Sequence, residues 1–227
     1  MEREKFVQRA KELLGKEFLK QSGAVLYSSS ETLERGEIYL LGTNPGGREL
    51  ETIGSHLDRL MCYIKNQYVD EDWNGGPGKS RMQEYVKNLM NGLNLNIREI
   101  CSSNLIFKRT AGLGSMSGAE FYELADICWK AHRIIIQEIV KPKVIIAFGN
   151  GVKSAYGYIF WKFKEHLRAQ STCASHYKNW ICKAHQASIE GMKITVIGVP
   201  HLSYYNVEGK VDVVRWLKEN LKEAGIL

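Results

Sequence analysis

The chain has 227 residues, of which 44% are hydrophobic and 25% are charged, and 31 Lys and Arg residues stand against 25 Asp and Glu residues. This length and composition are typical of a globular protein, and a chain of this size can bury roughly 70% of its unfolded surface without disulfides or a metal. The composition therefore excludes a disordered or fibrous chain, and the net positive charge suits a polyanionic partner such as DNA.

The cysteine pattern and the hydropathy indicate in which cellular compartment we expect the protein. No CxxC pair occurs, and the count is odd: Cys62, Cys101, Cys128, Cys173 and Cys182. This pattern argues against a disulfide framework or a zinc site and favours reduced thiols. No segment is apolar for long enough to cross a membrane, and the charged N-terminus does not resemble a signal peptide. We expect a cytoplasmic monomer with no membrane attachment.

The N-terminal region predicts an amphipathic helix. Apolar residues recur at helical spacing over residues 4–20, namely Phe6, Ala10, Leu13, Leu14 and Phe18. We expect residues 1–35 to form a helical extension that packs on one domain spanning residues 1–227.

The first predicted central strand is Glu37–Leu41, a short apolar run without helical spacing. A glycine-rich turn follows directly, Gly42-Thr43-Asn44-Pro45-Gly46-Gly47, and carries one side chain with both a donor and an acceptor, Asn44. Open α/β sheets place their ligands at such strand ends, and glycine lets a backbone approach a ligand closely. An ordinary strand-to-helix turn is the alternative, since Asn-Pro and Pro-Gly are common turn dipeptides.

The next segments alternate between helix and strand. We predict helices over residues 54–67 and 80–91, separated by a loop rich in glycine and acid, and then a strand over residues 100–107. Asn is disfavoured inside a strand, so Asn104 needs a reason. Its amide either bonds a neighbouring loop or binds the edge of a nucleobase.

The middle of the chain continues this alternation. The basic loop containing Lys108 and Arg109 leads to Ser117, which has capping-box spacing to Glu120 and opens a long helix that Pro142 ends. Residues 143–148 are a predicted central strand. The turn Gly149-Asn150-Gly151 either cradles a phosphate or caps the following helix.

The last third holds the least regular segment and a second strand end. Residues 168–190 interleave basic and aromatic residues, which suits a nucleic-acid surface or a solvated hairpin edge. The predicted strand 193–199 ends at Val199-Pro200-His201-Leu202-Ser203, and a helix over residues 207–224 closes the chain. Four predicted strands alternating with helices indicate a three-layer α/β/α fold with a mainly parallel four-stranded sheet, in which Asn44 and His201 could line one crevice.

These motifs resemble those of the uracil-DNA glycosylase superfamily. Gly42-Thr43-Asn44-Pro45-Gly46 is similar to the GxNPG motif of its mismatch-specific and single-strand-selective branches, and Val199-Pro200-His201-Leu202-Ser203 resembles the second motif. Ser102-Ser103-Asn104-Leu105-Ile106 resembles the middle strand. The resemblance covers roughly residues 36–221 and implies the same α/β/α fold.

The resemblance implies a DNA glycosylase that hydrolyses the N-glycosidic bond of a deaminated base, most simply uracil, without a cofactor or metal. Asn44 and His201 would be catalytic, and Asn104 would read the base. Substrate-binding residues would be Gly42, Thr43, Pro45, Gly46, Gly47 and Ser203. The DNA contacts would come from Arg48, Lys108, Arg109, Leu202 and Tyr204, with Leu202 or Tyr204 filling the gap left by an extruded base.

The sequence departs from the family pattern in two places. No aromatic residue follows the first motif closely, and the distant candidates for stacking on a base are Tyr63, Tyr68 and Trp73. The second motif carries Pro200 before His201 and Leu202 after it, not the usual order. Two alternatives therefore stay open: a non-catalytic member of the fold that binds nucleic acid or a nucleotide, and an unrelated flavodoxin-like α/β enzyme.

Overall fold

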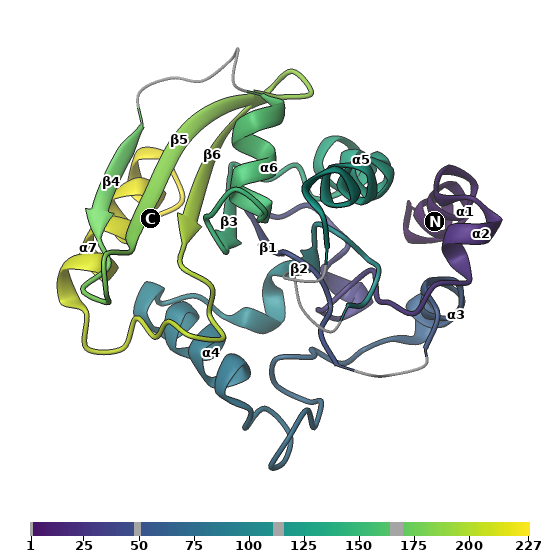
Figure 1. Cartoon of the computed structure of the whole chain (residues 1–227), viewed down its shortest axis with the longest axis horizontal. Coiled ribbons are helices and arrows are strands. Elements are labelled where there is room, and N and C mark those ends of the chain that lie inside the picture. The colour runs from purple at the N-terminus through teal and green to yellow at the C-terminus, as the bar shows by residue number, and fades with distance from the viewer. Residues whose placement is uncertain (1, 48–50, 111–115, 164–169) are drawn as a thin grey trace.

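The computed structural model describes residues 2–47, 51–110, 116–163 and 170–227, and its centre is a six-stranded mixed sheet. The strands lie in the order β2-β1-β3-β6-β5-β4 (Figure 1). Four are parallel: β1 (Ile38–Gly42), β2 (Cys101–Asn104), β3 (Val144–Phe148) and β6 (Met192–Val199). These are the four strands that the sequence predicts, with bounds shifted at their ends and β2 shorter by its last three residues.

The prediction of only four strands is wrong, because a hairpin extends the sheet beyond β6. β5 (Ile181–Ile189) pairs antiparallel with β6, and β4 (Ser171–Ala174) pairs antiparallel with β5. This hairpin lies within residues 168–190, for which the sequence allowed either a nucleic-acid surface or a solvated hairpin edge. Because β5 runs against β6, the turn between β4 and β5 lies at the carboxyl end of β6.

Helices cover both faces of the sheet, as alternate strand residues show. Tyr39 and Leu41 belong to one hydrophobic cluster, whereas Ile38 and Leu40 belong to another. The first cluster includes residues of α1 (Glu2–Leu14), α3 (Ile53–Arg59), α5 (Gly118–Ile134) and α6 (Ala155–Lys162). The second includes residues of α4 (Arg81–Leu93) and α7 (Val211–Glu223). Strands that are buried on both faces consist of continuous runs of apolar residues, which is why β1, β3 and β6 can be recognised in the sequence.

The helix ends follow local sequence signals. Gly15 has φ of 78° and separates α1 from the short α2 (Lys16–Leu19), so the predicted single helix over residues 4–20 is two helices. Ser80 and Gln83 form a capping box at α4, and Ser117 accepts a hydrogen bond from the Glu120 amide at the start of α5.

The remaining helical turns are short. They are η1 (Ser30–Thr32), η2 (Leu60–Cys62), η3 (Ile97–Glu99) and the π-helical η5 (Ile135–Ile139) that extends α5. The helix predicted over residues 54–67 is shorter, since α3 passes into η2. The helical spacing of apolar residues predicts that Val152 and Val211 face inward, but both are exposed, because Val152 precedes α6 and Val211 begins α7. Within the described ranges, no helix has the length and apolarity needed to cross a membrane.

Candidate functional site at the carboxyl edge of the sheet

A cavity of about 830 Å³ lies at the carboxyl ends of the central strands. Segments that follow β1, β3 and β6 line it, together with the start of β5. The sheet order reverses between β2-β1 and β1-β3, and ligands of open α/β sheets bind at such reversal points. The residues that line it include Thr43, Asn44, Thr110, Lys153, Trp180, Lys183 and His201.

Asn44 is held at the cavity by a residue that the sequence did not single out. Its Nδ2 donates to Thr110 Oγ1 at 2.7 Å and to the Pro45 carbonyl at 2.9 Å. The Thr110 amide in turn donates to the same Pro45 carbonyl at 3.1 Å. Both amide hydrogens of Asn44 are therefore used, and its Oδ1 remains as an acceptor that can orient a water molecule.

His201 is held as a neutral hydrogen-bond donor. Its Nδ1 accepts a hydrogen bond from the Ser203 amide at 3.2 Å. Burial lowers the pKa of His201 below its usual 6.5, so the ring is neutral at pH 7. A neutral imidazole whose Nδ1 accepts carries its proton on Nε2. Phe148 packs edge-on against the ring, with centroids 5.9 Å apart.

Thr43 adds a hydroxyl to the same edge. Its side chain is buried, lines the cavity, and has an Oγ1 without a hydrogen-bond partner among the described residues. A Cβ at Gly149 would lie 3.0 Å from this oxygen, so the β3 loop passes close beside it. A buried hydroxyl without a partner is available to a polar ligand atom.

Asn104 is buried and does not line the cavity. The side chain is only 2% exposed, and the structure shows no hydrogen bond to its amide among the described residues. It stands beside Gly42 in the β1–β2 register. A Cβ at Gly42 would meet Asn104 Oδ1 at 2.1 Å and ring atoms of Phe148 at 2.7 and 2.8 Å. Gly42 therefore leaves the space that the amide and the ring share.

Replacing Gly42 by alanine should destabilise the fold, because the new methyl group would overlap both neighbours. Overpacking of this kind costs roughly 1–3 kcal/mol, which corresponds to a fall in melting temperature of about 2–12 °C for a chain of this size. Gly46→Ala is the matched control, since open space surrounds its Cβ position. Equal melting temperatures for the two variants in thermal denaturation would contradict this packing.

The turn Gly149-Asn150-Gly151 joins three strands and does not cap a helix. Asn150 Nδ2 donates to the Ile181 carbonyl at 2.7 Å and to the Gly198 carbonyl at 3.1 Å. The N-cap of α6 is Ser154, which accepts from the Gly157 amide at 3.0 Å. The amide of Asn150 therefore fixes the β3 loop against the first residue of β5.

Lys108 and Arg109, two of the predicted DNA-binding cations, are not among the residues that line the cavity. The Arg109 guanidinium donates to the Gly46 carbonyl and so braces the glycine turn, while Lys108 lies 3.9 Å from Glu120. Gly46 lines the cavity, and Gly47 adopts φ of 85° and is exposed next to it. Arg48, also predicted to contact DNA, lies outside the described residues.

The segment after His201 alternates between core and surface. Leu202 is fully buried in the cluster under α7, so the prediction that it inserts into DNA is corrected: its side chain is a core group. Tyr204 is 61% exposed, lines the cavity, and lies under the Arg81 guanidinium at 5.8 Å. Ser203 lines the cavity as well, and Tyr205 is buried.

The aromatic residues that the sequence offered for stacking do not line the cavity. Tyr68 is fully buried and packs against Phe148, with centroids 6.3 Å apart. Tyr63 is buried beside α3, and Trp73 packs against Tyr68. The aromatic rings at the cavity are instead Tyr204 and Trp180.

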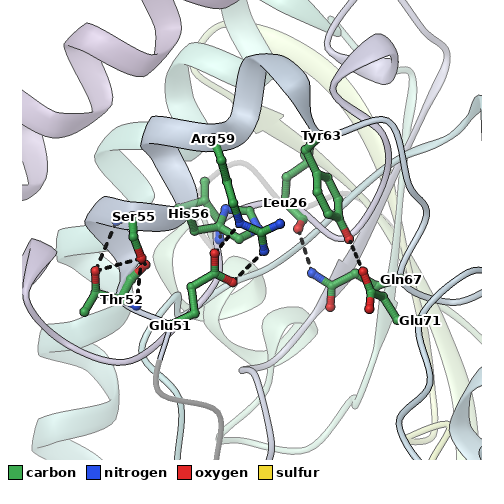
Figure 2. Close-up of polar contacts among 10 residues, drawn as sticks. Leu26, Glu51, Thr52, Ser55, His56, Arg59, Tyr63, Gln67 and Glu71 are labelled. Carbon is green, nitrogen blue, oxygen red and sulfur yellow. Dashed lines mark hydrogen bonds and ion pairs between the residues drawn. The ribbon is translucent and has the colours of Figure 1, made fainter.

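A second polar cluster surrounds His56 on α3 (Figure 2). Glu51 and Arg59 form a two-pronged ion pair, with one contact of 2.7 Å, and the Arg59 guanidinium lies 5.0 Å from the centre of the Tyr63 ring. His56 Nδ1 accepts from the Val25 amide at 3.4 Å, and its buried Nε2 has no partner among the described residues. Burial, aided by Arg59 and Arg109, lowers the pKa of His56 to about 4.

We expect the stability of the protein to fall as the pH drops from 6.5 toward 4. Burial lowers the pKa of three histidines, His56, His132 and His185, to about 4. The unfolded chain takes up protons below its pKa of about 6.5 and the folded protein does not, so each group costs on the order of 1–2 kcal/mol at pH 5. Urea denaturation at pH 7 and pH 5 measures the loss, and His56→Gln should flatten the profile. Equal midpoints at both pH values would contradict this account.

The charged side chains that line the cavity, over the described residues, are all positive. Lys153 and Lys183 line it, and no Asp or Glu is among its lining residues in the described part of the chain. Lys153 Nζ donates to the Met116 carbonyl at 2.7 Å, and Lys183 Nζ donates to the Asn150 carbonyl at 3.4 Å. The described residues contain no cluster of three His, Cys, Asp or Glu side chains that could hold a metal ion. The site therefore offers a neutral imidazole, an amide, hydroxyls and cations.

Comparison with known proteins adds no relative to this picture. No protein-family model matches the chain, and no curated protein matches it significantly.

Proposed function

We propose that the protein is a monofunctional DNA glycosylase that hydrolyses the N-glycosidic bond of a deaminated base, most simply uracil. The observation that carries this proposal is the hydrogen bond from the Ser203 amide to His201 Nδ1, which makes Nε2–H a donor at the cavity that Asn44 also lines. The resemblance of both motifs to the uracil-DNA glycosylase superfamily supports it. We further propose a monomer that works in the cytoplasm, consistent with five free cysteines.

The chemistry divides between the two catalytic residues. As the bond between base and sugar breaks, the base gains negative charge and the sugar becomes positive. Nε2–H of His201 donates to the base oxygen that takes the charge, as preorganised donors do at developing oxyanions. Asn44 Oδ1 orients the water that adds to the anomeric carbon, and the proton that this water loses passes through solvent to the departing base anion, so that sugar and base are both released neutral. An amide is a poor base, so positioning and leaving-group stabilisation carry the rate, and we expect a slow enzyme.

Asn104 is the proposed base-reading group. Its amide has the donor and acceptor that the edge of uracil requires. Asn104 is buried and does not line the cavity, so a base reaches the amide only if neighbouring side chains move.

A panel of oligonucleotides tests the reaction class. Strands that carry uracil, hypoxanthine or a mismatch are incubated with the protein and then treated with alkali, which breaks the chain at abasic sites. We expect cleavage only after alkali, because no lysine lies inside the motifs and the two cavity lysines, Lys153 and Lys183, donate to the Met116 and Asn150 carbonyls instead of acting as nucleophiles. A covalent adduct trapped by borohydride would contradict the hydrolytic mechanism.

Tyr204 is the proposed wedge for paired DNA. Its ring is exposed at the rim of the cavity, and bulky side chains hold an unstacked step open. Tyr204→Ala should slow base release from duplex uracil by roughly tenfold more than from single-stranded uracil, because only the duplex leaves a gap. The ratio of the two single-turnover rates measures this, and an unchanged ratio would remove Tyr204 from the role.

A non-catalytic nucleic-acid-binding protein is the second candidate. The absence of a carboxylate from the cavity lining, over the described residues, favours it, since no strong base is at hand to activate water. Salt-sensitive DNA binding without release of any base would identify this alternative. An unrelated flavodoxin-like enzyme would show neither property.

A further inference from the structure

The turn between β4 and β5 forms one wall of the cavity. Residues 175–180 connect the two strands at the carboxyl edge of the sheet, where the β1 and β6 motifs also end (Figure 1). Asn179, Trp180 and Ile181 line the cavity from this side. The hairpin lies outside the four parallel strands, and the proposed chemistry of Asn44 and His201 makes no use of it.

Hydrogen bonds hold this turn in one conformation. The Ser175 amide donates to the Trp180 carbonyl at 3.1 Å, and the Trp180 amide donates to the Tyr177 carbonyl at 3.2 Å. The buried Tyr205 hydroxyl donates to the Ser175 carbonyl at 2.9 Å. Tyr205 belongs to the segment after His201, so the turn is fixed relative to the proposed catalytic histidine. A fixed aromatic surface binds with less loss of entropy than a mobile one.

The turn combines aromatic rings with positive charge. Trp180 and Tyr177 pack edge to face, with centroids 5.1 Å apart, and Lys178 Nζ lies 5.4 Å from the centre of the Trp180 ring. Trp180 is partly exposed, Ile181 is 41% exposed, and Lys183 lines the cavity beside them. A carboxylate, Asp212, lies 3.9 Å from His176, but neither residue lines the cavity.

We propose that this turn binds single-stranded DNA, with Trp180 as a stacking platform for the base next to the one in the cavity. Any base can stack on an indole face, and Lys178 and Lys183 are placed to neutralise the adjoining phosphates. The proposal rests on the proposed function, because the next base of the strand lies at Trp180 only if the cavity holds one base. It adds a binding element from the hairpin that the motifs do not contain.

Binding to an inert strand tests the platform separately from catalysis. Fluorescence anisotropy with a labelled oligothymidylate measures affinity without any cleavable base. Trp180→Ala should weaken binding on the order of 5- to 100-fold, whereas Trp180→Phe should keep most of the affinity. Trp161→Ala is the matched control, because Trp161 is 49% exposed on α6 and packs against Tyr122, away from the cavity lining.

The salt dependence separates the lysines from the ring. Lys183→Gln should lower the slope of log affinity against log salt by about 0.7, the value for one phosphate contact on a single strand. Trp180→Ala should lower affinity with the slope unchanged. If Trp180→Ala binds the oligothymidylate as tightly as the wild type does, the proposal that Trp180 is a stacking platform is wrong, even if the protein releases a base from other strands. If the ring and slope effects appear without base release, the platform stands and the glycosylase proposal fails.

Discussion

Replacing His201 by alanine should slow base release from single-stranded uracil DNA by roughly 30- to 1,000-fold, while DNA affinity changes little. The loss corresponds to about 2–4 kcal/mol, the range for one donor that stabilises a developing oxyanion. The physical reason is that Nε2–H, fixed by the Ser203 amide at Nδ1, interacts most strongly after charge has moved onto the base. Single-turnover rates with saturating protein measure the chemical step directly.

The pH dependence checks that the donor is the neutral ring. Burial lowers the pKa of His201 below 6.5, so most of the rings are already neutral at pH 7 and the neutral fraction rises little above that pH. The wild-type rate should therefore be level between pH 7 and 8.5. A rate that falls as the pH rises through 7 would indicate that a charged imidazolium is the donor and would contradict this part of the mechanism.

Replacing Asn44 by alanine should reduce kcat by roughly 10²- to 10³-fold with KM nearly unchanged. The amide acts on the water that attacks in the transition state, and a group that acts only there affects kcat more than binding. Steady-state kinetics on a uracil-containing strand separate the two constants. A rise in KM at constant kcat would show instead that Asn44 contributes to binding alone.

Two further variants test how Asn44 is held. Asn44→Asp retains an oxygen that can orient water, so it should keep more activity than Asn44→Ala. Thr110→Val removes the hydroxyl that accepts from Asn44 Nδ2 at 2.7 Å and leaves the size of the side chain unchanged. It should lower kcat by a smaller factor, roughly tenfold, because Pro45 still holds the amide. Full activity in Thr110→Val would show that the turn alone positions Asn44.

The central parallel sheet could be predicted from the sequence because its strands are buried on both faces. Continuous apolar runs such as residues 143–148 have few other interpretations. Asn44 and His201 could be paired because each follows such a strand, and the structure places both along one cavity. That inference needed no knowledge of loops, only the rule that parallel strands end at the same edge.

The hairpin and the cavity wall could not be predicted in the same way. β4 is a short, exposed edge strand with a polar sequence, so its pattern differs little from that of a loop. Thr110 reaches the cavity through a contact between segments far apart in the chain, which leaves no local signal, and the basic and aromatic pattern around Trp180 does not say which ring lines the cavity. The resemblance predicts Leu202 or Tyr204 at the DNA because the gap-filling side chain comes from the loop after the second motif, and only the packing shows that Leu202 is buried and Tyr204 is exposed.

The most direct measurement is the release of free uracil from a single-stranded oligonucleotide, compared between the wild type and the Asn44→Ala/His201→Ala double variant. Both proteins are checked first for equal melting temperature and equal affinity for an inert strand. The account predicts that the wild type releases uracil and leaves an abasic site, and that the double variant binds the strand but releases none above background. Failure of the wild type to release any deaminated base, or equal release by both proteins, would contradict the assignment of this cavity as a glycosylase active site.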